Sequence, residues 1–135
     1  MSVYLRDSVS ITPVLRDGAP TTGRIDSLQM SNPGGYFTED IFVGTFVEGI
    51  VFIYTTAHGG TNPTLDCDIQ YGFKDANNQM HYLDSGDSFT QITTTDGMFI
   101  KKFSANFGRH IRLRLKIGGT NTPTYTVTAR VVLKG

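Results

Sequence analysis

Two stretches near the end of the chain alternate apolar and polar residues. From Ile111 to Ile117 every second residue is Ile or Leu, and His110, Arg112, Arg114 and Lys116 fill the other positions. The stretch from Tyr125 to Lys134 alternates in the same way. Side chains alternate faces along a strand, so each stretch predicts a strand with one buried face and one wet face. The Gly/Asn/Pro loop between them predicts an antiparallel hairpin, which needs a second layer to cover its apolar face.

The rest of the chain repeats this pattern in shorter pieces. Leu65–Phe73 alternates, and the apolar run Ile50–Tyr54 is typical of a central strand covered on both faces. Phe99, Phe103 and Phe107 also fit a helical spacing, but the segment is short, and the Thr-rich residues before it and Gly97 disfavour a helix start, so a strand is favoured. Further short strands are expected within 23–30, 36–46, 79–83 and 89–93. About eight to nine strands with frequent turns predict an all-β antiparallel sandwich or jelly roll.

The length of 135 residues fits one domain, whose core would draw on nine Phe and six Tyr. Residues 1–20 are predicted to form an extended N-terminal arm, and residues 21–135 the β-sandwich. Val9 and Ile11 alternate only weakly, and Pro13 and the turn Asp17–Pro20 interrupt the pattern. Such an arm is expected to pack on a neighbouring subunit, to pack on its own domain, or to stay disordered.

Composition argues against several classes of partner. The formal net charge is zero, which gives no support for nucleic-acid binding. The single cysteine, Cys67, permits no internal disulfide, which fits a reducing compartment or a fold that needs no cross-link. The N-terminal residues lack a signal-peptide pattern, and no apolar run reaches the length of a membrane span. We therefore expect synthesis in a cytosol, with no nucleic-acid or membrane partner.

No motif predicts catalysis. The chain contains neither a Gly-x-Ser-x-Gly nucleophile elbow nor a Walker A loop. His58, His81 and His110 lie far apart in the sequence and are interpreted as solvent-facing residues. Cys67 falls on the inward face of its strand, where a thiol behaves as a small inert hydrophobe. We therefore predict that the protein is not an enzyme and has no catalytic residues.

Carboxylates are the remaining candidates for a metal site. Asp66 and Asp68 project from one strand face, and Asp75, Asp84 and Asp87 occupy turns. The sequence lacks the regular calcium-loop pattern, and turn carboxylates mostly accept hydrogen bonds from their own backbone. We therefore expect no metal and no cofactor.

The basic row His110, Arg112, Arg114 and Lys116 is the one charged feature with a direction. Three interpretations are open: an intramolecular ladder to Asp66 and Asp68, a contact with another subunit, or a contact with nucleic acid. The first is favoured because solvated faces usually pair their charges locally, and the subunit contact ranks second.

A short sequence also recurs. Gly59–Thr64 reads Gly-Gly-Thr-Asn-Pro-Thr, and Gly118–Thr124 reads Gly-Gly-Thr-Asn-Thr-Pro-Thr. One interpretation is a duplicated hairpin unit, or two loops that share a surface at one end of the sandwich. The favoured interpretation is recurrent turn chemistry, because Gly and Asn accept positive φ and Pro starts a strand without a ladder donor.

Residues 20–135 resemble the small β-sandwich head decoration, or auxiliary capsid, proteins of tailed bacteriophages. The resemblance rests on Leu65–Tyr71 with its Asp/Asn turn, Phe89–Thr93, Gly108–Leu115, and Gly118–Val127 with the Val-rich terminal strand. His110 stands where Tyr or Phe is more usual. The resemblance implies a non-enzymatic virion protein that clamps the major capsid protein as a homo-oligomer, often a homotrimer.

This interpretation selects candidate interface residues from the arm and the basic row: Tyr4, Leu5, Val9, Ile11, Arg112, Arg114 and Lys116. The alternative is a carbohydrate-binding or fibre-tip adhesin module on the same kind of sandwich. Sugar binding usually needs exposed aromatic platforms, so the absence of Trp weakens this alternative. The aromatic residues available for it are Tyr36, Phe37, Tyr54 and Tyr82.

Overall fold

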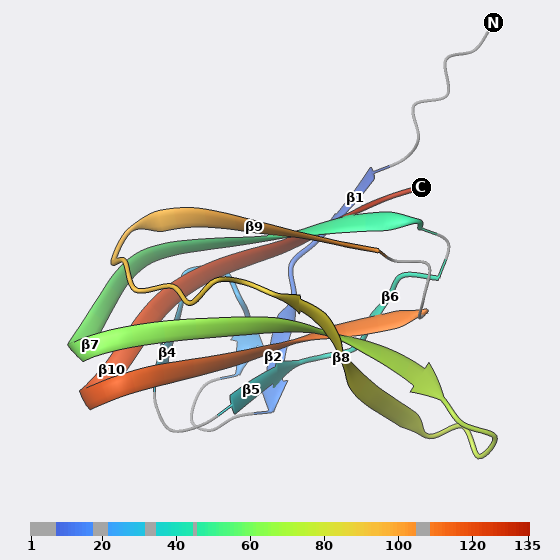
Figure 1. Cartoon of the computed structure of the whole chain (residues 1–135), viewed down its shortest axis with the longest axis horizontal. Coiled ribbons are helices and arrows are strands. Elements are labelled where there is room, and N and C mark those ends of the chain that lie inside the picture. The colour runs from blue at the N-terminus through green and yellow to red at the C-terminus, as the bar shows by residue number, and fades with distance from the viewer. Residues whose placement is uncertain (1–7, 18–21, 32–34, 45, 105–108) are drawn as a thin grey trace, which may run out of the picture.

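The computed structural model describes residues 8–17, 22–31, 35–44, 46–104 and 109–135 (Figure 1). The strands within these ranges are β1 (Ser8–Ile11), β2 (Val14–Asp17), β3 (Gly23–Arg24), β4 (Leu28–Ser31), β5 (Gly35–Thr38), β6 (Ile41–Phe42), β7 (Glu48–Lys74), β8 (Met80–Ser88), β9 (Gly97–Ser104) and β10 (His110–Lys134). The described part of the chain contains no helix that is long and apolar enough to cross a membrane. All the pairings are antiparallel, so the predicted all-β antiparallel class is confirmed.

Two long strands organise the fold. β7 has 27 residues and β10 has 25. They pair almost from end to end, from Glu48 opposite Lys134 to Gly72 opposite His110. Both strands bend near their middle, and Figure 1 shows the paired ribbon folding back on itself at that point. One continuous sheet therefore forms both layers of the sandwich.

The bend explains why the predicted hairpin is wrong. The pairing of β7 with β10 shifts register between Gly118 and Thr120 and again between Thr120 and Thr124. Gly60 and Gly119 have φ of 86° and 119°, and Asn62, Asn121 and Thr122 also have positive φ. These residues turn each strand sharply without reversing it. The segments 109–117 and 125–134 are therefore two halves of one strand, and they pair with β7 rather than with each other.

The two copies of the recurrent sequence lie side by side at this bend. Thr61 pairs with Thr120, and the Asn121 side-chain nitrogen donates a hydrogen bond to the Thr61 hydroxyl at 2.6 Å. The turn expected at Gly59–Thr64 is likewise a bend and does not end a strand, because β7 runs through that segment. The interpretation that the two segments share one end of the sandwich agrees with the structure.

We call the two layers layer I and layer II. Layer I contains β9, residues 48–57 of β7 and residues 124–134 of β10, with β1 and β4 along the outer edge of β10. Layer II contains β8, residues 64–74 of β7 and residues 110–118 of β10, followed by β5 and β6, then β2 and β3. Each layer thus receives half of each long strand.

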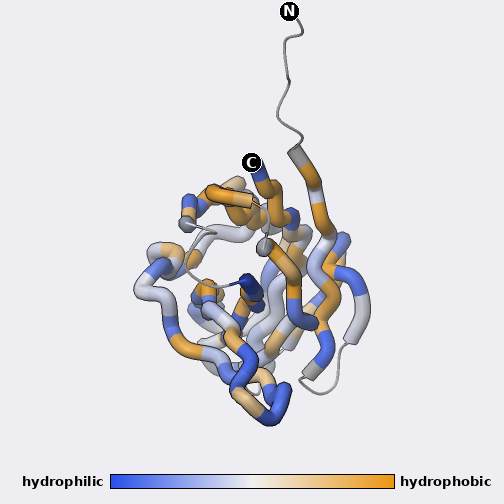
Figure 2. The backbone as a smooth tube through the Cα atoms, turned by 90° about the vertical axis from the view of Figure 1, so that its right-hand side faces the viewer, coloured by the Kyte–Doolittle hydropathy of each residue, from blue (hydrophilic) through white to orange (hydrophobic). Residues whose placement is uncertain are grey.

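The inward-facing residues of both layers form one core. Side chains with 0% exposure include Val51, Ile53, Cys67, Ile69, Leu113, Leu115, Val127 and Val131. Figure 2 shows hydrophobic and hydrophilic positions following one another along the backbone tube, as the alternation requires. Burial raises the pKa of the Cys67 thiol far above its ordinary value, and Asp68 adds to that effect. The predicted inward position of Cys67 is therefore confirmed.

Shorter elements follow the predictions in part. Of the predicted arm, residues 8–17 belong to the sheet: β1 lies on the edge of β10, β2 pairs with β5, and Leu15 is 1% exposed. The segment Gly97–Ser104 is the predicted strand, whereas Phe107 lies outside the described residues. β8 runs on through the predicted turn at 84–87, where its pairing with β7 shifts register. Of the predicted strand 89–93, Ile92 makes an isolated bridge to Leu65.

Candidate functional site

The outward-facing side of layer I is apolar. In the register of β7, Phe52 lies between Ile100 of β9 and Arg130 of β10, and Tyr54 lies beside Met98. The residues next to each of them in the sequence face the core, so these side chains point outward. We define the apolar face as Ile50, Phe52, Tyr54, Met98, Ile100 and Val132.

Part of this face is strongly exposed. Tyr54, Ile100 and Met98 are 40%, 54% and 70% exposed. The prediction that Ile50–Tyr54 is a central strand is confirmed, but on its outer side Ile50 and Phe52 are only partly buried and Tyr54 is exposed. Layer II packs against the inward side of layer I, and the sandwich has no third layer of described residues to pack against the outward side. An exposed apolar patch of this kind marks a contact surface on many soluble proteins.

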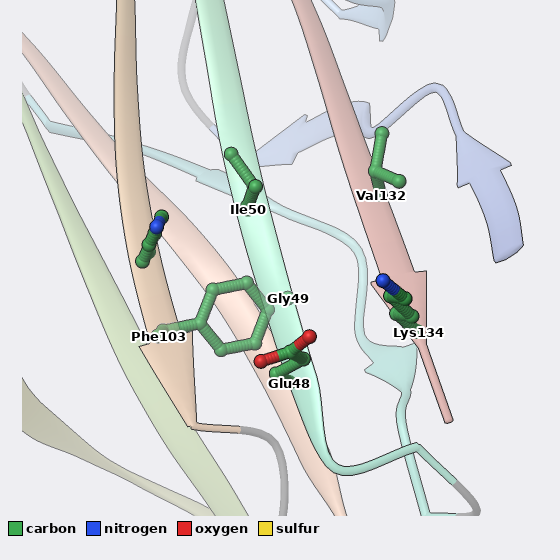
Figure 3. Close-up of a pocket in the computed structure, with 7 residues that line it drawn as sticks. Glu48, Gly49, Ile50, Phe103, Val132 and Lys134 are labelled. Atoms are coloured by element: carbon green, nitrogen blue, oxygen red, sulfur yellow. The ribbon is translucent and has the colours of Figure 1, made fainter.

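Two hollows lie on layer I. One, of about 410 Å³, is lined by Ser10, Phe52, Tyr54, Met98, Thr128, Arg130 and Val132. The other, of about 330 Å³, lies where β7 begins and β10 ends, and we call it the end groove. Figure 3 shows Glu48 and Ile50 on β7, Val132 and Lys134 on β10, and the Phe103 ring against Gly49. Lys102 completes its lining.

Charges on layer I lie around the apolar face. Glu48, Lys102 and Lys134 line the end groove, with one negative and two positive side chains. Beside the other hollow, Arg130 lies 3.6 Å from an Asp26 carboxylate oxygen. The centre of the face is thus aliphatic and aromatic, and its ends are charged, which is the arrangement found in many protein interfaces.

The outward-facing side of layer II is polar around Arg112 and Arg114, although Phe42, Phe73 and Leu83 elsewhere in this layer are 55%, 48% and 61% exposed. Arg114 on β10 pairs with Asp68 on β7, its Nη2 lying 2.5 Å from Oδ2. The Ser88 hydroxyl donates to the same carboxylate at 2.7 Å. Lys116 lies opposite Asp66 in the register, and Asp66 accepts a hydrogen bond from the Gln91 side chain at 3.1 Å. The favoured interpretation of the basic row, an intramolecular ladder, is therefore confirmed for Arg114 and Asp68.

Arg112 lies between two aromatic rings on this side. Its guanidinium carbon is 4.0 Å from the centroid of the Phe37 ring and 3.9 Å from that of Tyr82. Arg112 Nε donates to the Gln70 side-chain oxygen at 2.7 Å, and the Gln70 amide donates to Asp84 at 2.9 Å. We call Phe37, Gln70, Tyr82, Asp84 and Arg112 the aromatic–arginine stack. It places two rings and several hydrogen-bonding groups side by side.

A carboxylate next to this stack bridges two strands. Asp40 accepts a hydrogen bond from the Tyr82 hydroxyl at 2.7 Å and contacts His110 Nδ1 at 2.6 Å. Burial, followed by the hydrogen bond to Asp40, raises the pKa of Tyr82 well above its ordinary value. Tyr82 therefore stays protonated over the physiological range and acts as a donor.

The three histidines do not form a reactive cluster. The side chain of His81 is 49% exposed and pairs with Asp75 at 2.7 Å. His58 packs edge-on against Tyr125, and the side chain of His110 is only 16% exposed. The prediction of a solvent-facing residue therefore fails for His110, because Asp40 and Phe42 cover it. Among the residues that the structure describes, no three His, Cys, Asp or Glu side chains gather as metal ligands do.

The predicted interface residues fall in different places. Val9 is 38% exposed on the edge strand β1, whereas Ile11 packs against the core of its own chain. Arg112 and Arg114 make the contacts described above, and Lys116 is exposed. Tyr4 and Leu5 lie outside the described residues. No observation tests whether any of these seven residues contacts a partner.

Sequence reasoning did not select Met98 and Ile100, which are the most exposed residues of the apolar face. The signal was present, because Met98–Phe103 has apolar residues at both odd and even positions. One of its two faces had to meet the core, so the other was available for a partner. Among the predicted aromatic candidates for sugar binding, Tyr36 is 0% exposed and belongs to the core.

Comparison with known proteins shows the fold. No family model and no curated protein matches the chain. The SPBc2 prophage-derived protein YomS is similar in structure, with a TM-score of 0.51 and 12% identity over 100% of this chain and 99% of that one. The xylan-binding module CBM15 gives a TM-score of 0.51 and 10% identity over 96% of this chain and 97% of that one.

The CBM22-1 xylan-binding domain from Paenibacillus barcinonensis Xyn10C is a third similar structure. Its TM-score is 0.50, with 13% identity over 98% of both chains. All three likenesses extend over nearly the whole length of each chain, which supports the β-sandwich described above. At these identities they establish the architecture alone.

Proposed function

We propose that the chain is a non-enzymatic structural protein of a tailed-phage virion, which binds the major capsid protein and stabilises the capsid as a homo-oligomer. The observation that carries this proposal is the exposed apolar face of layer I. Under this proposal the protein is made in the host cytoplasm and ends in the virion. Two observations support a phage origin: the likeness to a prophage-derived protein, and the sequence motifs within 65–127 that resemble phage decoration proteins.

The chemistry of the apolar face favours a protein partner. Its most exposed residues, Met98 and Ile100, have no hydrogen-bonding group, and Phe52 and Tyr54 add aromatic surface. Sugars need donors and acceptors beside an aromatic ring, whereas a protein interface needs an apolar centre with a polar rim. A lattice also repeats each contact many times, so modest individual affinities add up to firm retention.

The test is co-sedimentation with capsids assembled from the major capsid protein of the phage or prophage that carries this gene. We expect the unmodified protein to pellet with the capsids, and the double variant Met98→Glu/Ile100→Glu to bind at least about tenfold more weakly, because charge would be buried against an apolar partner.

Leu83→Glu is the matched control, since Leu83 is 61% exposed but lies on β8 in layer II. It should bind capsids like the unmodified protein. Failure of the unmodified protein to pellet would refute the proposed function. Equal binding by the Met98/Ile100 double variant would place the contact elsewhere on the molecule and refute the role of the apolar face.

A second candidate function is carbohydrate binding on layer II. The observation in its favour is the aromatic–arginine stack, where the rings of Phe37 and Tyr82 lie beside Gln70, Asp84 and Arg112. Aromatic rings next to planar polar side chains suit the apolar and hydroxyl-bearing faces of a sugar. Two of the similar structures are xylan-binding proteins of the same architecture.

Affinity electrophoresis in gels containing soluble xylan, together with a glycan array, tests this candidate. Retention that is lost in Tyr82→Ala but kept in Tyr54→Ala would support it, because Tyr54 lies on the other layer. Absence of retention in both assays, or equal retention of the two variants, would argue against a sugar site at the stack.

A further inference from the structure

We infer that the end groove of layer I receives the N-terminal segment, residues 1–7, of a second copy of this chain. The groove is lined by Glu48, Gly49, Ile50, Lys102, Phe103, Val132 and Lys134 and holds about 330 Å³ (Figure 3). This inference rests on the homo-oligomer of the proposed function and names the segment that joins two of its copies, although such assembly itself needs no capsid.

The end groove is built to receive a short apolar segment. Phe103 is only 4% exposed, and its ring packs against Gly49, where a Cβ would come within 2.4 Å of it, so the exposed part of the groove is formed by its other residues. Ile50 and Val132 are partly exposed side chains that lie opposite each other in the register of β7 and β10. The wall is therefore mostly hydrocarbon, and side chains of the size of Val or Leu would remove it from water.

The sequence of residues 1–7 matches this groove. It reads Met-Ser-Val-Tyr-Leu-Arg-Asp, so that Met1, Val3 and Leu5 share one side in an extended conformation. Arg6 and Asp7 follow the apolar part. The groove offers one acidic and two basic side chains, Glu48 with Lys102 and Lys134, which can pair with both of these charges.

The length of residues 1–7 is sufficient to cross the end groove. Seven extended residues span at most about 23–25 Å. The groove crosses three neighbouring strands, β9, β7 and β10, which is a width of about 10 Å. The segment joins the fold at Ser8, beside the groove of its own chain, so the assignment to a second copy depends on the direction in which the chain approaches Ser8.

The direction of β1 favours a second copy over the same copy. Ser8 pairs with Lys134, the last residue of β10, and β1 runs antiparallel to β10, so a chain that kept the direction of β1 before Ser8 would point away from the end of β10. To reach the groove of its own chain, the segment would have to reverse direction at once. Residues 1–7 contain neither Gly nor Pro, the residues that most favour such a reversal. A groove on a neighbouring copy requires no reversal.

The first test measures the oligomeric state of the purified protein by sedimentation velocity and light scattering. We expect the full chain to form an oligomer and a variant lacking residues 1–7 to sediment as a monomer. Leu5→Asp and Val132→Asp should each shift the equilibrium toward the monomer by at least about tenfold. Ser2→Asp and Thr126→Asp are matched controls on the same segment and the same strand, and they should assemble normally.

The second test distinguishes the two copies by cross-linking. Leu5→Cys protein and Val132→Cys protein are mixed and oxidised, and we expect a disulfide-linked heterodimer between them. Cys67 is 0% exposed and does not interfere. A full-length protein that remains a monomer, or an unchanged oligomer after removal of residues 1–7, would overturn the inference.

The Leu5→Cys/Val132→Cys double variant tests the same-copy alternative. A disulfide that forms within this chain but not between the two single variants would overturn the second-copy assignment as well. Circular dichroism of each variant shows whether it is folded, so a loss of assembly is separated from unfolding. The isolated protein suffices for both tests. An oligomer that does not bind capsids would therefore leave this inference standing and count against the proposed function alone.

Discussion

Layers I and II are made from halves of the same two strands, yet their outer sides differ in chemistry. On β7, residues 50, 52 and 54 in layer I are Ile, Phe and Tyr, whereas residues 66, 68 and 70 in layer II are Asp, Asp and Gln. On the inner side both halves carry buried aliphatic residues. A continuous strand thus keeps one inner pattern for folding and changes its outer pattern at the bend.

This difference indicates that the inward-facing residues and the outward-facing residues of a strand have separate roles. Layer II satisfies its outer polar groups within the chain, through the Arg114–Asp68 pair and the aromatic–arginine stack. Layer I leaves Met98 and Ile100 mostly in water, where they contribute little to the stability of the isolated chain. We therefore assign stability to both inner faces and to the outer face of layer II, and the proposed function places its partner on the outer face of layer I.

The largest expected effect tests whether the two inner faces form one core. Ile53→Ala in layer I and Ile69→Ala in layer II both remove side chains that are 0% exposed and belong to the same cluster. Each should lower the free energy of unfolding by about 2–5 kcal/mol, through lost burial and the cavity left behind. Urea denaturation followed by circular dichroism and by tyrosine fluorescence should give coincident single transitions for both variants.

Separate transitions for the two probes would break the comparison. They would mean that one layer melts without the other, so that the bent strands do not transmit cooperativity through the bend. The conservative variants Ile53→Val and Ile69→Val serve as controls and should cost about 0.5–1.5 kcal/mol each.

The sequence predicted the inner pattern better than the connectivity. Alternation from Ile111 to Leu133 identified which residues face the core, because a period of two holds whatever the strand pairs with. It did not tell a bend from a reversal at Gly118–Thr124. Gly, Asn and Pro favour both outcomes, and the choice depends on the matching bend in β7, which is nearly 60 residues away in the sequence.

The functional faces were predicted less well for a related reason. The ladder of Arg114 to Asp68 could be proposed because both rows of charge are regular in sequence. The apolar face joins β7 and β9, whose pairing no local pattern specifies. The aromatic–arginine stack likewise brings Phe37 and Tyr82 together from the two sides of β10 and β7. Alternation gives faces but not neighbours, so such clusters emerge only from the fold.

A smaller effect compares the inner faces of the two layers. Replacing one buried threonine in each layer by valine should change the free energy of unfolding in opposite directions. Thr38 in layer II is 3% exposed, and its hydroxyl accepts a hydrogen bond from the Leu113 amide at 2.9 Å. Thr55 in layer I is 0% exposed, and its hydroxyl has no hydrogen-bond partner among the described residues. Thr38→Val should lower the free energy of unfolding by about 1–3 kcal/mol, because it leaves a buried amide unsatisfied.

Thr55→Val has nearly the same shape but should leave stability unchanged or raise it by up to about 1 kcal/mol, because it removes a buried hydroxyl that lacks a partner. Chemical denaturation with an unchanged m-value gives both differences. A clear loss of stability in Thr55→Val would show that the hydroxyl is satisfied in solution, and the two inner faces would then be equivalent.

The smallest expected effect compares the outer faces directly. Asp68→Ala removes the partner of Arg114 in layer II, whereas Ile100→Ala shortens a side chain that is 54% exposed in layer I. The Arg114 and Asp68 side chains are 41% and 24% exposed, so solvent screens their attraction. We expect Asp68→Ala to cost about 0.5–1 kcal/mol and Ile100→Ala to stay within about 0.5 kcal/mol. The cost of Asp68→Ala should shrink in 1 M salt, where charges are screened over about 3 Å. If Ile100→Ala destabilised the isolated chain more than Asp68→Ala, the outer side of layer I would serve the fold itself, and its assignment to a partner would lose its physical basis.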